Sequence, residues 1–155
     1  MLFSESTQAF YLPEVNYGVD LPRDVIEISD NEYQRLYKAV NECRRVYINN
    51  QGIEISEKRP DKYYEWDLSS NSWKISEENK IKKESDIINE RFQIKQYLME
   101  KASSKVTPLQ DAVDLGIATE EEKETLNKWK SYRVALNRLS VNASDIIEWP
   151  KPPEL

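Results

Sequence analysis

The sequence contains no histidine, one cysteine and only three glycines among its 155 residues. Without histidine, the usual zinc sites lose a principal ligand, and serine or cysteine nucleophiles lose their ordinary base. Three glycines are too few for the loops that cradle phosphates or dinucleotides. Cys43 has no partner for an internal disulfide, so a reducing compartment fits best, and we interpret it as a semi-buried residue at a helix end. We therefore expect a non-enzymatic protein with no cofactor and no metal.

The chain also lacks an excess of positive charge and any long apolar run. Its net charge is −6, and residues 1–30 contribute −5 of it through six acids and one arginine. Such a surface repels phosphate groups, which argues against nucleic acid as a partner. No stretch approaches the roughly 20 apolar residues that span a bilayer, so we expect no membrane partner. The opening MLFSESTQAFYL has neither a basic segment nor a small-residue cleavage site, so we expect no signal peptide.

Residues 1–60 read as a small mixed α/β module. FYLPEVNYG is rich in strand-forming residues, and VIEIS alternates as a short strand does. Ser29 and Glu32 have the spacing of a capping box, which predicts that a helix begins there. VYINNQGIEIS, residues 46–56, predicts a β-hairpin that turns at Asn-Asn-Gln-Gly.

The polar stretch EKRPDK, residues 57–62, marks the expected end of this module. YYEWDLSSNSWKI follows at residues 63–75 and predicts a second small hairpin, with a tryptophan on each side of its turn. The two tryptophans could form a binding platform, or they could pack across the strands as aromatic pairs do in small sheets. We treat residues 61–76 as a Trp-containing hairpin or linker.

Residues 77–155 read as a helical hairpin module with an extended IEWP tail. Between residues 81 and 113 a 4-3 repeat of apolar residues is interrupted only at Ser85 and Lys95. A narrow seam of this length is typical of a coiled coil or a long helical hairpin. Pro108 lies within the seam, and we expect it to kink the helix or to restart it.

The stretch TPLQDAVDLGIATEEE, residues 107–122, predicts a tight connection between two antiparallel helices. Gly116 stands where the end of the first helix needs a left-handed residue, with Ile117 folding back on the last turn. Thr119 begins a capping box for the second helix, residues 119–139. The expected fold class is therefore α+β: a small mixed N-terminal domain with short strands and one helix, then a long helix and a C-terminal antiparallel helical hairpin.

The C-terminal third of the chain resembles a known family. VTPLQDAVDLGIATEEEKETLNKWKSYRVALNRL followed by DIIEWPKPP, within residues 106–153, is similar to the signature of bacteriophage and prophage tail fibre assembly proteins. YEWDLSSNSWKIS resembles a Trp-containing segment of some members, and FYLPEVNYGVDLPRDVIEIS is similar to a recurrent family opening. Where many members carry a proline-rich linker, this chain has EKRPDK and the Trp-containing hairpin.

The resemblance implies a chaperone in the bacterial host cytoplasm that binds the distal C-terminal region of a trimeric tail fibre. It would promote folding and trimerisation of the fibre without ATP. Interwoven, β-rich fibre tips pair distant strands, which is slow and exposes sheet edges to aggregation. The alternative is a structural component that stays at the fibre tip in the virion and takes part in recognition of host-surface glycan, since exposed aromatics would suit sugar stacking.

Two sets of residues are candidates for contact with partners. Interaction hot spots favour aromatic side chains, although a role in the core is an equal alternative for each N-terminal one. The seam is longer than a single partner helix of about 20 residues can cover, which predicts a homodimer. Trp149, in the tail, is expected to fold back on the helical hairpin. The candidates for partner binding are Phe10, Tyr11, Tyr17, Tyr63, Tyr64, Trp66 and Trp73. The candidates for the oligomer seam are Ile81, Ile88, Phe92 and Met99.

Overall fold

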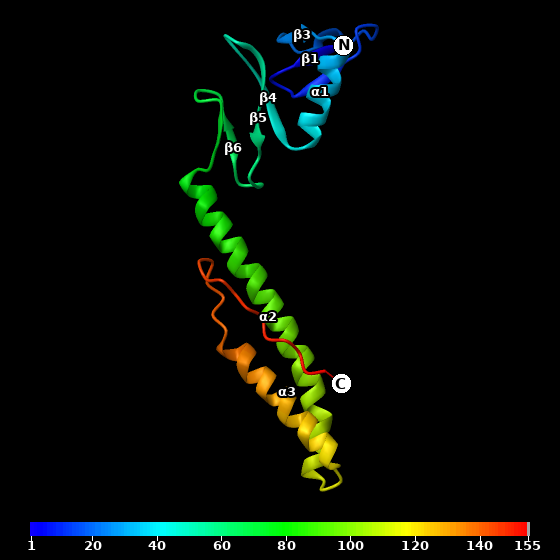
Figure 1. Ribbon diagram of the computed structural model, residues 1–155, viewed down its shortest axis with the longest axis vertical. Coiled ribbons are helices and arrows are strands. Elements are labelled where there is room, and N and C mark those ends of the chain that lie inside the picture. Colours follow the sequence, from blue (N-terminus) through cyan, green and yellow to red (C-terminus); the bar gives the residue numbers. More distant parts are fainter. Residues whose placement is uncertain (155) are drawn as a thin grey trace. The chain divides into compact units, whose positions relative to one another are not determined.

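The computed structural model describes residues 1–154 and divides them into two compact units, one of residues 1–80 and one that begins at Ile81. Small antiparallel sheets and one helix form the first unit, and two helices dominate the second, which confirms the α+β class. The elements, most of which are labelled in Figure 1, are β1 (Leu2–Ser4), β2 (Ala9–Tyr11), the 3-10 helix η1 (Gly18–Asp20), β3 (Val25–Glu27), α1 (Asp30–Asn41), β4 (Arg44–Asn49), β5 (Gly52–Lys58), β6 (Glu65–Asp67), β7 (Ser72–Lys74), α2 (Glu77–Asp114) and α3 (Glu120–Arg138).

Helix α1 begins with the predicted capping box. The Ser29 hydroxyl accepts a hydrogen bond from the backbone N–H of Glu32, and the Glu32 carboxylate accepts one from the N–H of Ser29. These two bonds satisfy N–H groups that the first turn would otherwise leave unpaired. Cys43 follows the helix with a φ of 59° and is exposed. The prediction that Cys43 is semi-buried was wrong, because Cys43 lies exposed in the turn between α1 and β4.

The core of the first unit forms between α1 and the strands. Three antiparallel strands in the order β2-β1-β3 make one sheet, with Phe3 opposite both Phe10 and Ile26. Phe3 is fully buried against Leu36 of α1 and Val46 of β4. Short strands alone are marginal in water, so burial of this shared apolar cluster holds them together.

Both predicted hairpins are confirmed. In the first, β4 pairs with β5, and Asn49 lies opposite Gly52, which leaves a two-residue turn. Gly52 has a φ of 118°, a backbone conformation that side chains rarely tolerate. In the second, β6 pairs with β7, and Trp66 lies opposite Trp73.

Helix α2 runs through Pro108 without a break, so the predicted restart at this residue was wrong. Proline removes the N–H that would bond to the carbonyl of Ser104. Both residues are exposed, so water can reach that carbonyl. In addition, the Thr107 hydroxyl donates to the carbonyl of Ser103 at 3.0 Å and stays inside the helix instead of capping a new one.

The connection between α2 and α3 has the predicted form. Gly116 has a φ of 71°, its N–H bonds to the carbonyl of Val113, and the N–H of Ile117 reaches back to the carbonyl of Ala112. These two bonds define the left-handed helix ending known as a Schellman motif. The Ile117 side chain stays 71% exposed, so only its backbone folds back. Thr119 then caps α3 through the predicted capping box with Glu122.

The core of the second unit is the contact between α3 and the C-terminal part of α2, which lie side by side (Figure 1). One stripe of α3 is buried, namely Leu126, Trp129, Tyr132 and Leu136. It packs against Ala102 and Val106 of α2, both from the predicted seam. Trp149 of the tail packs against the same cluster, so the prediction that it folds back is confirmed.

Candidate partner-binding surfaces

Phe10 lies at the margin of the first core. It is half-buried, and its ring contacts those of Phe3 at 5.2 Å and Tyr33 at 5.1 Å between centroids. Tyr37 extends this cluster outward and is 51% exposed. The position explains Phe10 as a packing residue and leaves Tyr37, which the sequence reasoning did not single out, as the accessible aromatic of the group.

Tyr11 and Tyr17 hold the loop after β2. Their rings meet edge to face at 5.2 Å, and the Tyr17 hydroxyl accepts a hydrogen bond from the N–H of Leu12. This brace presents three exposed aliphatic side chains on the loop, those of Leu12, Val15 and Val19. Scattered exposed aliphatics are normal on a protein, but several on one braced loop favour contact with a partner.

The two tryptophans of the second hairpin pack on each other and on the neighbouring hairpin. Trp66 meets Trp73 edge to face at 5.2 Å and lies 5.4 Å from the ring of Tyr47. The indole N–H of Trp73 donates to the carbonyl of Glu57 at 2.8 Å and to the hydroxyl of Ser56 at 3.3 Å. These contacts fasten β6 and β7 to β5, so the packing interpretation accounts for both tryptophans.

Tyr63 and Tyr64 lie in the segment between β5 and β6 and are both half-buried. The Arg59 guanidinium donates to the carbonyl of Tyr64 at 2.7 Å. The Asn79 side chain donates to the carbonyl of Tyr63 at 3.0 Å, and the Lys62 ammonium lies 5.0 Å from the Tyr63 ring. Backbone and side-chain contacts thus fix both tyrosines close to the Trp-containing hairpin.

The seam of α2 has a covered and an open part. Met99 packs against the second core, and the seam residues after it are buried or partly buried there. Before Met99 the seam is open, with exposed fractions of 68% for Ile81, 38% for Ile88 and 47% for Phe92.

Lys95 explains where the cover ends. Its ammonium donates to the carbonyls of Asn137 at 3.0 Å and Leu139 at 2.8 Å, at the C-terminal end of α3. A cation there satisfies unpaired carbonyls and the negative end of the helix dipole. Arg91, one turn earlier, donates to the carbonyl of Asn142 in the tail.

The loop from β1 to β2 blocks one edge of the first hairpin. The Gln8 amide donates to the carbonyl of Val46 and accepts from its N–H, both at 2.8 Å. The Glu5 carboxylate accepts from the N–H of Ile48 at 3.2 Å. Two side chains therefore substitute for a neighbouring strand, and no local pattern in the sequence points to them.

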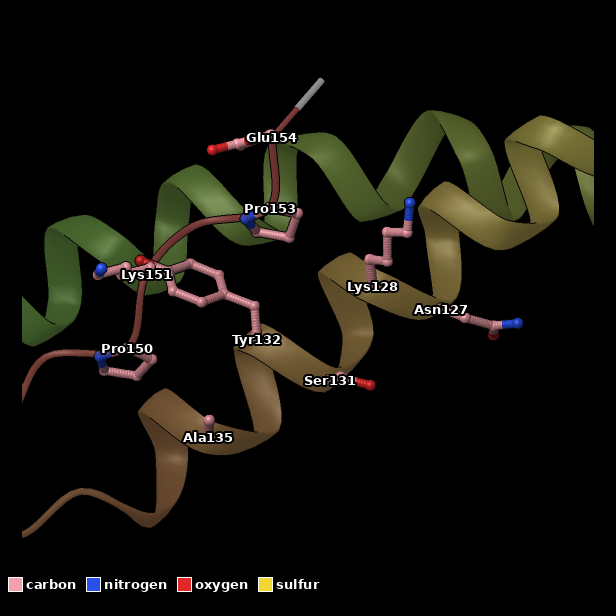
Figure 2. Close-up of a pocket in the computed structure, with 9 residues that line it drawn as sticks. All are labelled: Asn127, Lys128, Ser131, Tyr132, Ala135, Pro150, Lys151, Pro153 and Glu154. Atoms are coloured by element: carbon pink, nitrogen blue, oxygen red, sulfur yellow. The ribbon is translucent and has the colours of Figure 1, made fainter.

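The tail forms a shallow groove along α3. Figure 2 shows the Tyr132 ring pointing from α3 toward Pro150, Lys151 and Pro153 of the tail. Burial raises the pKa of the Tyr132 hydroxyl above its usual value. The tail thereby completes the cover of the second core.

Two carboxylates are held by local donors. The backbone N–H of Ser6, with the hydroxyls of Ser4 and Ser6, lowers the pKa of Asp24. The Lys74 ammonium, with the hydroxyl and N–H of Ser69, lowers the pKa of Asp67 in the second hairpin. Both groups stabilise turns rather than a reacting centre.

Within residues 1–154, no group of three or more acidic or cysteine side chains is placed to hold a metal ion. Across the same residues, no helix is both long and apolar enough to cross a membrane.

Comparison with known proteins decides the family. A family model described as "Caudovirales tail fibre assembly protein, lambda gpK" matches residues 6–154. The chain belongs to this family. The family is one of assembly proteins and not of enzymes. The resemblance seen in the C-terminal third thus extends over nearly the whole chain.

Individual relatives differ in how much of their length is matched. The chain is similar to a probable tail fiber assembly protein of Shigella phage SfV, with 32% identity over 152 residues that cover 98% of this chain and 77% of the relative. It is similar to the tail fiber assembly protein of Escherichia phage lambda, with 50% identity over 66 residues that cover 43% of this chain and 34% of the relative. Protein TfaD of Escherichia coli (strain K12) is 53% identical over 66 residues, which cover 35% of its length. No solved structure matches the chain.

Proposed function

We propose that this protein is a chaperone that binds the distal C-terminal region of a phage tail fibre and promotes folding and trimerisation of the fibre without ATP. Its place of action is the cytoplasm of the bacterial host. The observation that carries the proposal is the match to the tail fibre assembly family over residues 6–154. A fibre tip built from interwoven strands exposes sheet edges while it folds, and a bound partner keeps them from aggregating.

In this proposal the first unit recognises the fibre. It carries the exposed aliphatic loop with Leu12, Val15 and Val19 and the accessible ring of Tyr37. The second unit then serves to bring copies of the protein together. This division assigns recognition to residues 1–75, where the structure is built from short strands and loops, and assembly to the helices.

The test is the yield of SDS-resistant trimers of the tail fibre encoded in the same phage genome. The fibre is expressed alone, with the full chain, and with two chimeras that carry residues 1–75 or 106–155 of a relative. We expect soluble trimers only with the full chain, and a change of fibre preference only with the first chimera. Equal trimer yield from the fibre alone would contradict the chaperone function.

The open half of the α2 seam supports a homodimer, in which a second copy covers Ile81, Ile88 and Phe92. Where α3 packs on the same 4-3 repeat, from Met99 onward, the seam residues are buried or partly buried, which shows that such a seam is covered when a helix is available. Light scattering at micromolar concentration should give twice the 18.3 kDa of one chain. Replacement of Ile88 and Phe92 by aspartate should give monomers, whereas a monomeric wild type would exclude the dimer.

The alternative function is a component retained at the fibre tip that takes part in recognition of host-surface glycan. It would place the protein in the virion, so the composition of purified particles distinguishes the two. The packing of Trp66 and Trp73 against each other and against β5 leaves less aromatic surface for sugar stacking than the alternative requires. Absence of the protein from particles would support the transient chaperone.

A further inference from the structure

The two edges of the β4–β5 hairpin differ in how their backbone groups are paired. On the β4 side, Gln8 and Glu5 bind the N–H groups of Val46 and Ile48 and the carbonyl of Val46. An unpaired strand edge is a template for another strand, and this one is closed by side chains from the chain itself. On β5, Trp73 donates to the carbonyl of Glu57 and Arg35 to that of Ile53, whereas no side chain bonds to the backbone of Ile55 within residues 1–154.

Strand register identifies the free groups on β5. In an antiparallel pair, opposite residues alternate between those that bond to each other and those that point outward. The backbone N–H and carbonyl of Val46 point outward to Gln8. The N–H and carbonyl of its partner Ile55 therefore point outward on the other side of the hairpin, as do those of Ile53, which lies opposite Ile48. The Arg35 guanidinium donates to the carbonyl of Ile53 at 3.2 Å. Within residues 1–154, the outward N–H and carbonyl of Ile55 have no hydrogen-bond partner.

An open groove lies beside this edge. One wall is α1, which contributes Arg35, Lys38 and Glu42 at helical spacing, and the other is the strand edge at Ile55. Arg44 of β4 and the buried Ala39 complete the lining. The groove is thus bounded by a helix and by a strand with free backbone groups, which is the shape that an added extended strand occupies.

The charge of the groove selects the added strand. Arg35, Lys38 and Arg44 face it, and the single acid is Glu42. Three cations and one acid give the lining an excess of two positive charges. Glu42 lies 3.4 Å from Arg44 and 3.9 Å from Lys38, and Glu57, outside the lining, lies 3.9 Å from Arg44, so Arg35 and Lys38 supply most of the charge that remains available. The chain as a whole has a net charge of −6, and its first 30 residues are strongly acidic. The groove is therefore a local exception that favours an acidic segment.

We propose that an extended, acidic segment of the tail fibre adds as a strand to the outer edge of β5, beside α1. The inference rests on the proposed function, because it specifies how the fibre is held. The backbone of the fibre segment bonds to Ile55, and its acidic side chains lie against Lys38, Arg35 and Arg44. While the β-rich tip folds slowly, strand addition would cover an exposed sheet edge of the fibre. The edge would be released when the trimer forms.

The first test removes the free donor. Ile55→Pro deletes the outward N–H, while the bonded pairs of the β4–β5 ladder keep theirs, because proline is tolerated at outward positions of edge strands. Binding is measured by calorimetry with the full chain and a purified C-terminal fragment of the tail fibre from the same phage genome. We expect the dissociation constant to rise at least about tenfold, since the fibre carbonyl loses its partner.

The second test changes the charge without touching the strand. Lys38→Glu should weaken binding of the same fragment roughly threefold, with a smaller effect at high salt, because the lysine is largely exposed. Lys105→Glu is the matched control, since it makes the same charge change at an exposed position of α2. An equal effect of the two substitutions would show that net charge and not the groove matters.

A third measurement needs no substitution. Hydrogen exchange on the wild-type protein should show that the amide of Ile55 is slowed in the complex, whereas that of Val46, already bonded to Gln8, changes little. This hydrogen-exchange measurement tests strand addition even if Ile55→Pro fails to fold. Tight binding with unchanged exchange at Ile55 would overturn strand addition and leave the chaperone function standing. Failure of the wild-type protein to bind the fragment would overturn both.

Discussion

The two units of the molecule are stabilised in different ways. In the first, polar side chains reach distant backbone groups, as Gln8 does at Val46 and Arg45 does at the carbonyl of Glu5. In the second, one buried stripe of α3 packs on one seam of α2, and caps close the helix ends. Periodic apolar positions and caps are local sequence patterns, whereas polar contacts between distant residues are not. The comparison shows why the fold of the second unit could be predicted from its sequence more fully than that of the first.

The largest expected effects come from two matched substitutions, Leu36→Ala in the first unit and Leu136→Ala in the second. Both leucines are fully buried. Each substitution should cost about 2–5 kcal/mol, because it removes buried methyl groups and leaves a cavity. If the units are stabilised separately, hydrogen exchange should show amides released only in the unit that carries the change.

Exposed leucines provide the controls. Leu68→Ala in the first unit and Leu115→Ala in the second change side chains that are 69% and 72% exposed. Each should alter stability by less than about 0.5 kcal/mol. If Leu36→Ala released the amides of α3 to the same extent as those of α1, the two units would unfold as one.

Next in size is Gln8→Ala, which tests the polar stabilisation of the first unit. The substitution leaves the N–H and carbonyl of Val46 without their partner, and Val46 is fully buried. Chemical denaturation should show a loss of about 1–3 kcal/mol. Gln51→Ala, in the exposed turn of the same hairpin, should have almost no effect. Similar losses from both would mean that the amide of Gln8 contributes nothing specific.

A smaller effect is expected at the turn of the second unit. Gly116→Val should destabilise the hairpin by on the order of 1 kcal/mol more than Gly116→Asn, because a β-branched residue is strained at a φ of 71° and asparagine tolerates it. No atom crowds the position of an added Cβ, so strain alone separates the two variants. Thermal unfolding of both proteins measures the difference, and equal midpoints would contradict this explanation.

The smallest effect is a dependence on pH in the first unit. The pKa of Asp24 is lowered in the folded protein, chiefly by the N–H of Ser6, so its ionised form stabilises the fold. This contribution is complete above the ordinary pKa of 3.8 and is lost as the pH falls through the folded value. Asp24→Asn should flatten this part of the stability curve. An unchanged curve would show that the carboxylate bonds about equally well to water.

Local patterns predicted every cap that the structure contains at the starts of α1 and α3. Ser29 with Glu32, and Thr119 with Glu122, act over three residues, so the sequence holds the whole arrangement. Gly116 is similar, because its role depends only on the turn before it. The pairing of the two hairpins followed from turn residues placed between runs of strand formers.

Other features depended on surroundings that the sequence does not display. Pro108 was expected to interrupt α2, yet it lies on the exposed side of the helix, where water and the Thr107 hydroxyl compensate. Lys95 interrupts the apolar repeat of the seam, but its ammonium donates to carbonyls at the C-terminal end of α3. The groove beside β5 could not be predicted either, because α1 and the strand edge meet only in the folded unit.

The contacts of Glu5 and Gln8 with β4 also bear on when the first unit folds during synthesis. They join residues 38 to 43 positions apart, and all of them lie within the first 48 residues of the chain. Ribosomes add roughly 5–20 residues per second, whereas hairpins form in microseconds. The segment that closes the first unit therefore emerges seconds before the last turn of α3 is made. Synthesis and folding proceed in the same order. The first unit can complete its fold while the helical hairpin of the second unit is still being translated.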